Sequence, residues 1–224
     1  MLQAEVLVKD VFPNKVVFLD NLMRTEQLSI NSVNDFVVDL NVPHPSNCLL
    51  ENDGPAAKKL KLDNSLEGSK VYALPNGEVT CNEPLSKLID QVKPLLRDLI
   101  EHANQIKMWI TYLIPRIEDG NNFGVSIQED TIAEARQVES DAATYLDQVS
   151  RYFLTRAKIV TKLAKYPHVQ DYRRAIQELD EKEFLSLRLV VCELRNHYCS
   201  LHDMILKNID KIKKPRSCNA ENLY

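Results

Sequence analysis

Residues 115–125 read PRIEDGNNFGV, and this short polar stretch separates two long segments whose apolar residues repeat with helical spacing. It contains two of the five glycines of the chain, Gly120 and Gly124, whereas residues 126–224 contain none. Glycine adopts positive φ without strain and asparagine tolerates it, so we expect the backbone to leave helical geometry here. A turn between antiparallel helices needs only about 2–5 residues. The surplus length, with its acidic and amide side chains, therefore indicates a contact surface carried by a helical scaffold.

A long helix is predicted on each side of this stretch. The helix before it runs from about residue 83 to 114, with Pro84 suited to the first turn. The helix after it begins near Ser126, a good N-cap with Glu129 in the capping-box position, and continues to about residue 165. Both carry apolar residues at alternating spacings of three and four.

Two further helical regions complete the prediction. Residues 1–40 look helical in two pieces that are broken near Pro13, and a last helix runs from beyond Pro167 to about residue 214. Helices this long are typical of bundles. We therefore predict an all-α fold, an antiparallel four-helix bundle whose long rods pack side by side into an oligomer.

Composition excludes several classes of protein. The net charge of −4 and the pI near 5.8 provide no general attraction to nucleic acid or to an anionic membrane. No apolar run approaches the ~18 residues of a membrane span. Because the five cysteines are odd in number and irregularly spaced, we interpret them as reduced thiols in a cytosolic or nuclear protein.

Residues 41–81 differ in character from the rest of the chain. They hold four prolines and three glycines, a density that predicts a flexible linker between an N-terminal helical segment, 1–40, and a C-terminal bundle domain, 82–224. The linker contains a short basic cluster, formed by Lys58, Lys59 and Lys61. An exposed Lys-rich stretch is what an import receptor recognises, so we expect a nuclear protein that is also cytoplasmic.

No residue pattern predicts catalysis or a cofactor. The chain lacks the glycine-rich phosphate loops, the nucleophile elbow and the His-Glu-x-x-His motif. One cluster on the last helix, Cys192, His197, Cys199 and His202, lacks the turn that usually separates zinc ligands, so we expect no metal there. Acidic residues such as Glu181 and Glu183 are expected to be solvated.

The C-terminus has a basic run followed by a polar tail, 217–224. We interpret the cations near the end of the last helix as complementing the helix dipole. The tail ends in Leu223 and Tyr224. A free terminus with apolar last residues can be a docking peptide, and the alternative is a frayed end.

Three stretches resemble one family, the 11S (REG) proteasome activators. Residues 114–125 are similar to the activation loop of that family. Residues 164–174 are similar to its turn between the third and fourth helices, and residues 205–216 are similar to its last helical turn. The ending NAENLY, residues 219–224, and the short Lys-rich linker resemble the gamma type of the family. The resemblance covers nearly the whole chain.

The resemblance implies a function and a set of site residues. The family forms rings of seven four-helix subunits around a channel, and the gamma type is a nuclear homoheptamer. Such a ring caps the core proteasome without ATP or ubiquitin recognition. C-terminal tails dock on the alpha-subunit ring of the proteasome, and activation loops move its gate aside. Carried over to this chain, the docking residues are Asn222, Leu223 and Tyr224. The loop residues are Arg116, Glu118, Asp119, Gly120, Asn121, Asn122, Phe123 and Gly124.

One departure from the family concerns the first helix. In the family this helix begins well before the position of Met1, so we expect only its last turns, near residues 2–12. An alternative start or an incomplete gene sequence would each explain this. A second hypothesis for the function is a structural coiled-coil adaptor, with the loop and the tail serving another partner.

Overall fold

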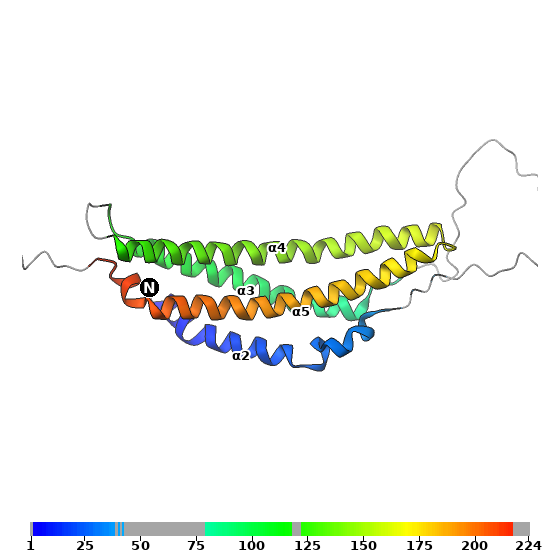
Figure 1. The fold of residues 1–224 in the computed structure, drawn as a ribbon, viewed down its shortest axis with the longest axis horizontal. Coiled ribbons are helices and arrows are strands. Elements are labelled where there is room, and N and C mark those ends of the chain that lie inside the picture. The colour runs from blue at the N-terminus through cyan, green and yellow to red at the C-terminus, as the bar shows by residue number, and fades with distance from the viewer. Residues whose placement is uncertain (1, 39, 41, 43–78, 118–121, 217–224) are drawn as a thin grey trace, which may run out of the picture.

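The computed structural model of the chain describes residues 2–38, 40, 42, 79–117 and 122–216. Four long helical rods lie antiparallel and side by side in an elongated bundle (Figure 1). The rods are the run formed by α1, η1 and α2, and the helices α3, α4 and α5. Their bounds, with those of the short segments, are α1 Leu2–Val6, η1 Leu7–Val11, α2 Phe12–Met23, η2 Glu26–Leu28, η3 Ile30–Phe36, α3 Glu83–Leu113, α4 Phe123–Lys165, α5 Gln170–Lys207 and α6 Ile209–Lys213. The predicted all-α bundle is confirmed.

The first rod runs from Leu2 to Met23, within the region 1–40 that was predicted to be helical but beyond the limit that the family resemblance implied. The expectation that only its last turns near residues 2–12 remain was wrong, because the helical run continues to Met23. The predicted break near Pro13 was also wrong. The turn just before it, η1, is a π-helix, in which the Phe12 N–H donates to the Leu7 carbonyl five residues back. The wider turn lets the helix pass a proline ring that would clash with the carbonyl of a regular α-helix.

The start of α3 agrees with the prediction, whereas that of α4 does not. Asn82 caps α3 by accepting a hydrogen bond from the Leu85 N–H at 3.2 Å, and Pro84 lies in the first turn. Helix α4 begins at Phe123, not at Ser126, so the capping-box prediction was wrong. The Ser126 N–H already bonds the Asn122 carbonyl within the helix, at 2.9 Å. Three additional residues of the polar stretch are therefore helical.

The last predicted helix is interrupted near its end. Helix α5 ends at Lys207, and α6 follows after Asn208, whose φ of −115° and ψ of 11° are not helical. The Asn208 side-chain amide donates to the Met204 carbonyl at 2.8 Å, which satisfies a carbonyl near the helix end. The interruption lies where the chain approaches the end of the bundle.

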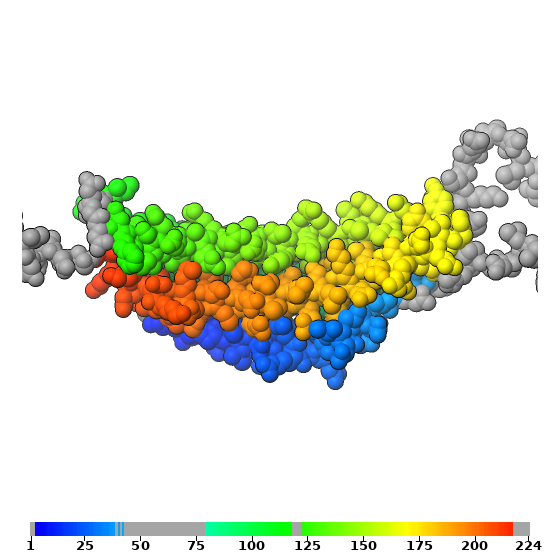
Figure 2. Space-filling view, viewed as in Figure 1, coloured from blue at the N-terminus to red at the C-terminus, as the bar shows by residue number. Residues whose placement is uncertain are grey.

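A large apolar core joins the four rods, and a second, smaller cluster contains Val42, Leu163 and Ile176. Helix α3 contributes a stripe of fully buried side chains, among them Leu88, Leu96 and Ile106, and α5 contributes Leu194 and Leu201. The space-filling view shows side chains closing the gaps between α2, α4 and α5 (Figure 2). None of the helices within the described residues is long and apolar enough to cross a membrane. The lysine cluster Lys58, Lys59 and Lys61 lies outside the described residues, so the linker and the nuclear import signal stay predictions.

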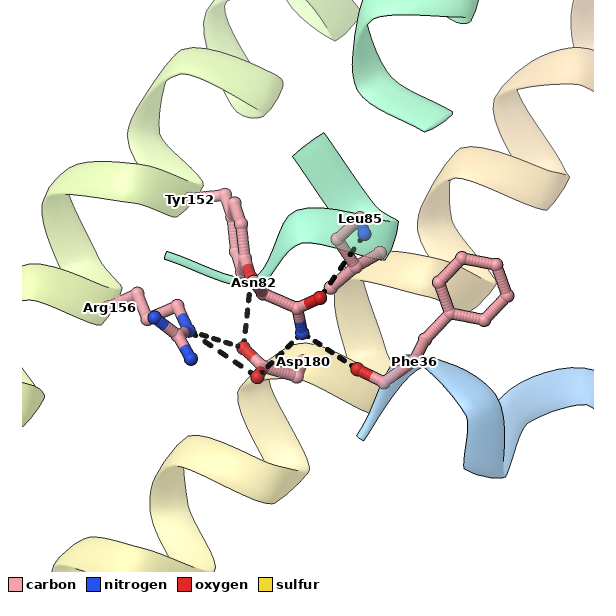
Figure 3. Close-up of polar contacts among 6 residues, drawn as sticks. All are labelled: Phe36, Asn82, Leu85, Tyr152, Arg156 and Asp180. Atoms are coloured by element: carbon pink, nitrogen blue, oxygen red, sulfur yellow. Dashed lines mark hydrogen bonds and ion pairs between the residues drawn. The ribbon is translucent and has the colours of Figure 1, made fainter. Parts of the chain in front are cut away.

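A buried polar network joins four segments in the half of the bundle nearer the turn between α4 and α5, and its contacts are drawn in Figure 3. At its centre is Asp180 of α5, which has no exposed surface. Its carboxylate accepts hydrogen bonds from the Tyr152 hydroxyl at 2.9 Å, from Arg156 Nε at 3.0 Å and from the Asn82 amide at 2.9 Å. The Asn82 amide also donates to the Phe36 carbonyl at 2.7 Å. The network therefore ties α4, α5, the start of α3 and the end of η3 together.

The structure corrects the expectation that Glu183 is solvated. Its side chain is buried, whereas Glu181 is half-buried. Burial raises the pKa of the Glu183 carboxyl to about 7 from its ordinary 4.5. The helical spacing of the sequence could not reveal this, because burial here depends on how α5 is covered by its neighbours.

Replacing Asp180 tests the buried network. Asp180→Ala leaves the Arg156 guanidinium buried without its counter-charge, so we expect a loss of about 3–5 kcal/mol in the free energy of unfolding. Denaturant titration at fixed protein concentration measures it. The control is Asp203→Ala, because Asp203 pairs with Lys207 at an exposed site on the same helix and should cost at most about 0.5 kcal/mol. Equal effects of the two changes would contradict this account.

Glu183 should make stability depend on pH. Because its folded pKa is raised, the folded protein binds more protons than the unfolded chain between about pH 4.5 and 7. Stability should therefore fall as the pH rises through this window, by up to about 1.4 kcal/mol per pH unit. We expect Glu183→Gln to remove this pH dependence. The free energy of unfolding of the variant should therefore exceed that of the wild type by more at pH 8 than at pH 5. Thermal unfolding at both pH values, with Glu181→Gln as control, would refute this if the two variants behaved alike.

Candidate functional site at the loop end of the bundle

Three chain segments meet at one end of the bundle. The end of α3, the start of α4 and the segment after α6 all lie at the end opposite the turn between α4 and α5 (Figure 1). Four of the predicted loop residues, Arg116, Asn122, Phe123 and Gly124, are among the described residues. The remaining predicted residues lie outside them: Glu118, Asp119, Gly120 and Asn121 of the loop, and Asn222, Leu223 and Tyr224 of the tail.

Gln128 holds the three segments together from inside. Its side chain is fully buried, and its amide donates to the Leu113 carbonyl at 3.1 Å and to the Ile212 carbonyl at 2.7 Å. Leu113 is the last residue of α3 and Ile212 the second-last of α6, and carbonyls in the last turn of a helix lack partners within that helix. One side chain of α4 thereby fixes both neighbouring helix ends. Gln128 was not among the predicted site residues, since a lone glutamine on a helix carries no local signal.

Gly124 allows a close approach of two backbones. A Cβ atom at this position would lie 2.1 Å from the Pro215 carbonyl oxygen, far inside contact distance. The sequence had suggested that Gly124 takes positive φ, but the residue is helical and buried in the first turn of α4. Its missing side chain, rather than its freedom of φ, is what the structure uses.

The two ends of the loop stretch expose apolar groups. Ile117, the last described residue before the gap, is fully exposed, and Phe123 is 66% exposed. Large apolar side chains held at the tip of a rigid bundle are suited to contact with another protein. This supports the interpretation of the stretch as a contact surface.

The basic run before the tail has specific partners as well as the helix dipole. Lys213 contacts the Glu5 carboxylate at 2.6 Å, which ties α6 to α1, and Lys207 contacts Asp203 at 2.6 Å. The hydrogen bond from Lys213 holds the pKa of the Glu5 carboxyl below its ordinary value. The dipole interpretation was therefore incomplete.

The cysteine and histidine cluster of α5 has other contacts. Cys192 accepts a hydrogen bond from Arg195, and His197 Nε2 lies 3.8 Å from the Asp141 carboxylate. Across the described residues, no group of three or more His, Cys, Asp or Glu side chains is arranged to hold a metal ion.

Adding a methyl group at Gly124 tests the close approach. In an ordinary helix alanine is more stable than glycine by about 0.5–1 kcal/mol. Here the new Cβ would collide with Pro215, so we expect Gly124→Ala to destabilise the protein and to speed amide exchange in α6. Thermal unfolding and hydrogen exchange measure the two effects. Ser126→Ala, in the same turn but exposed, should be nearly neutral, and a stabilising Gly124→Ala would refute the prediction.

Comparisons with known proteins agree with this architecture. A family model described as "Proteasome activator PA28, C-terminal" matches residues 78–222, and one described as "Proteasome activator PA28, N-terminal" matches residues 1–47. The chain is similar to "Proteasome activator complex subunit 3" of Homo sapiens, Mus musculus and Gallus gallus. Each is 56% identical over 230 residues, which cover 99% of this chain and 91% of the relative.

Solved structures show the same fold. One, "Crystal structure of the 11S subunit of the Plasmodium falciparum proteasome, PA28", matches with a TM-score of 0.71 and 33% identity, over 96% of this chain and 88% of that one. A second, "Crystal structure of archaeal 20S proteasome in complex with mutated P26 activator", matches with a TM-score of 0.58 over 65% of this chain and 73% of that chain. At 19% identity the second likeness concerns the fold alone. The resemblance seen in the sequence is thus confirmed, and the chain belongs to the PA28 family of proteasome activators.

Proposed function

We propose that this chain is a non-enzymatic activator of the core proteasome. It stimulates the degradation of peptides and proteins without ATP and without ubiquitin recognition. Membership of the PA28 family supports this, as does the similarity to the activator subunits of vertebrates and to the 11S subunit of Plasmodium falciparum. The archaeal complex of a 20S proteasome with an activator agrees at the level of the fold.

The observation that carries the proposal is that the described residues bordering the loop and the tail meet at one end of the bundle. Arg216, which precedes residues 217–224, donates hydrogen bonds to the Arg116 carbonyl and to the Asn122 side chain, and these two residues lie on either side of residues 118–121. A single face of the bundle can therefore present both the loop and the tail to one partner. The alpha-subunit ring of the core proteasome is the partner that this arrangement fits.

A ring of seven identical subunits is part of the proposal. Apolar side chains that a monomer would leave in water support side-by-side packing of the rods. They occur on several helices and include Val17 and Phe18 of α2, Leu154 of α4, and Leu185 and Leu189 of α5. Native mass spectrometry would decide the number of subunits.

Ring formation explains how tails that each bind weakly can hold the activator on the proteasome. One short tail binds weakly, but seven tails on one ring act at high effective concentration, so avidity supplies the affinity. Docking by itself does not favour an open gate over a closed one. A second contact must bind the open state better, because a ligand shifts an equilibrium only by its differential affinity. The loop at the rigid bundle end provides that contact.

The direct test mixes the purified protein with latent core proteasome and follows hydrolysis of fluorogenic peptides. The proposed activator raises the rate at saturating concentration in the absence of ATP. A structural adaptor would leave the rate unchanged, and that outcome would overturn the proposal.

Asn121→Tyr separates binding from activation. Asn121 lies between Gly120 and Asn122 in the loop stretch, where a bulky aromatic residue would strain any backbone conformation that favours small polar residues. We expect the ring and its binding to the proteasome to persist while stimulation of peptide hydrolysis is lost. Native mass spectrometry, co-sedimentation and the peptide assay measure the three properties.

The matched comparison is deletion of Leu223 and Tyr224, which should abolish binding and leave the ring intact. If Asn121→Tyr lost binding and activation in parallel, the loop would be a docking element, contrary to the proposal. Full activation by the variant would make the loop an ordinary helix connection.

A further inference from the structure

Arg216 lies at the junction between the body of the bundle and the tail. It follows α6 and Pro215, and it is the last described residue before 217–224. The segment that carries it is held at two points, one within α6 and one just after it. Gln128 bonds the Ile212 carbonyl at 2.7 Å, and Pro215 lies against the backbone of Gly124. The backbone at Arg216 is therefore placed next to the start of α4.

The Arg216 guanidinium contacts both ends of the loop stretch. One terminal nitrogen, Nη1, donates to the Arg116 backbone carbonyl at 2.9 Å, and the other, Nη2, donates to the Asn122 side-chain oxygen at 3.0 Å. Arg116 stands before residues 118–121 and Asn122 directly after them. A single side chain thus joins the two residues that flank the centre of the loop.

The geometry suits arginine and no other cation. The planar guanidinium presents donors in a fixed fork, so it can hold two acceptors at a set separation, whereas the ammonium of lysine is a point charge. Hydrogen bonds from a charged donor are also stronger than neutral ones. Both acceptors are uncharged amide oxygens, and they belong to segments about a hundred positions away in the sequence.

We propose that Arg216 is a positioning residue, which fixes both ends of the activation loop to the segment that precedes the docking tail. We call its two hydrogen bonds, to Arg116 and Asn122, the Arg216 clamp. Because the same residue borders the tail, the position of the loop is set relative to the docked tail rather than to the bundle alone. Loss of this clamp leaves the tail able to dock but leaves the loop poorly placed. The inference rests on the proposed function, since it concerns how that activator places its loop.

The test compares Arg216→Gln, Arg216→Lys and Lys214→Gln in the full-length ring. Lys214→Gln is the matched control, because it removes the same charge two residues away and Lys214 is exposed. We expect maximal stimulation of peptide hydrolysis to fall about tenfold in Arg216→Gln, equivalent to about 1.4 kcal/mol, with half-saturating concentration changed by less than about twofold. Arg216→Lys should not restore stimulation, and Lys214→Gln should behave like the wild type.

A double-mutant cycle with Asn122→Ala tests the contact itself. If Arg216 acts through Asn122, the effects of Arg216→Gln and Asn122→Ala on maximal stimulation should be less than additive. Additive effects would overturn the clamp. Unchanged maximal stimulation in Arg216→Gln, or a parallel loss of binding and stimulation, would overturn it as well.

A measurement without the proteasome separates this inference from the proposed function. In the isolated ring, amide exchange in the peptide that spans residues 115–124 should be faster in Arg216→Gln than in Lys214→Gln. Equal exchange in the two variants would show that Arg216 does not hold the loop. If the wild-type ring failed to stimulate the proteasome, the proposed function would be wrong, and the exchange comparison would still decide whether the clamp exists.

Discussion

The carboxylate of Asp180 is the constraint around which one half of the bundle is organised. A charged group without exposed surface is costly unless donors surround it, and here the donors come from Asn82, Tyr152 and Arg156. Asn82 also caps α3 and bonds the Phe36 carbonyl. Helices α4 and α5, the start of α3 and the end of the first helical region are thereby set in register. Apolar packing alone would tolerate sliding of such long rods, because their seams are similar along their length.

At the other end of the bundle, uncharged groups fix the backbones of neighbouring helices. Gln128 bonds a carbonyl near the end of α3 and one near the end of α6, and Gly124 admits the backbone of Pro215. These contacts leave the side chains of Ile117 and Phe123 exposed at the tip. A rigid end with exposed contact groups is what an activator needs if its loop is to select one state of a partner, since a loop that adapts to both states would favour neither.

Sequence reasoning succeeded where the signals are local. Proline and glycine positions and the spacing of apolar residues located the helices, and Pro84 marked the first turn of α3, whose cap Asn82 only the structure showed. It failed at Pro13, where a π turn preserves the helix, and at Ser126, where a good capping pattern lies inside a helix that has already begun. It also failed at Glu183, whose surroundings are supplied by the other helices rather than by its neighbours along α5.

The sequence by itself thus determined an all-α bundle of long rods, the place of the polar stretch 115–125 and the family to which the chain belongs. The bundle and the polar stretch depend on residue types at short spacings, which act through local backbone preference and helical periodicity. The family follows from the resemblance of whole stretches such as 114–125 and 205–216. Only the tertiary structure decided that Asp180 is buried with its donors and that Gly124 serves a close approach. Only it showed that Arg216 reaches both Arg116 and Asn122. The reason is that burial and hydrogen bonding of these groups depend on segments far away in the chain. No local pattern encodes which distant segment packs against a given residue.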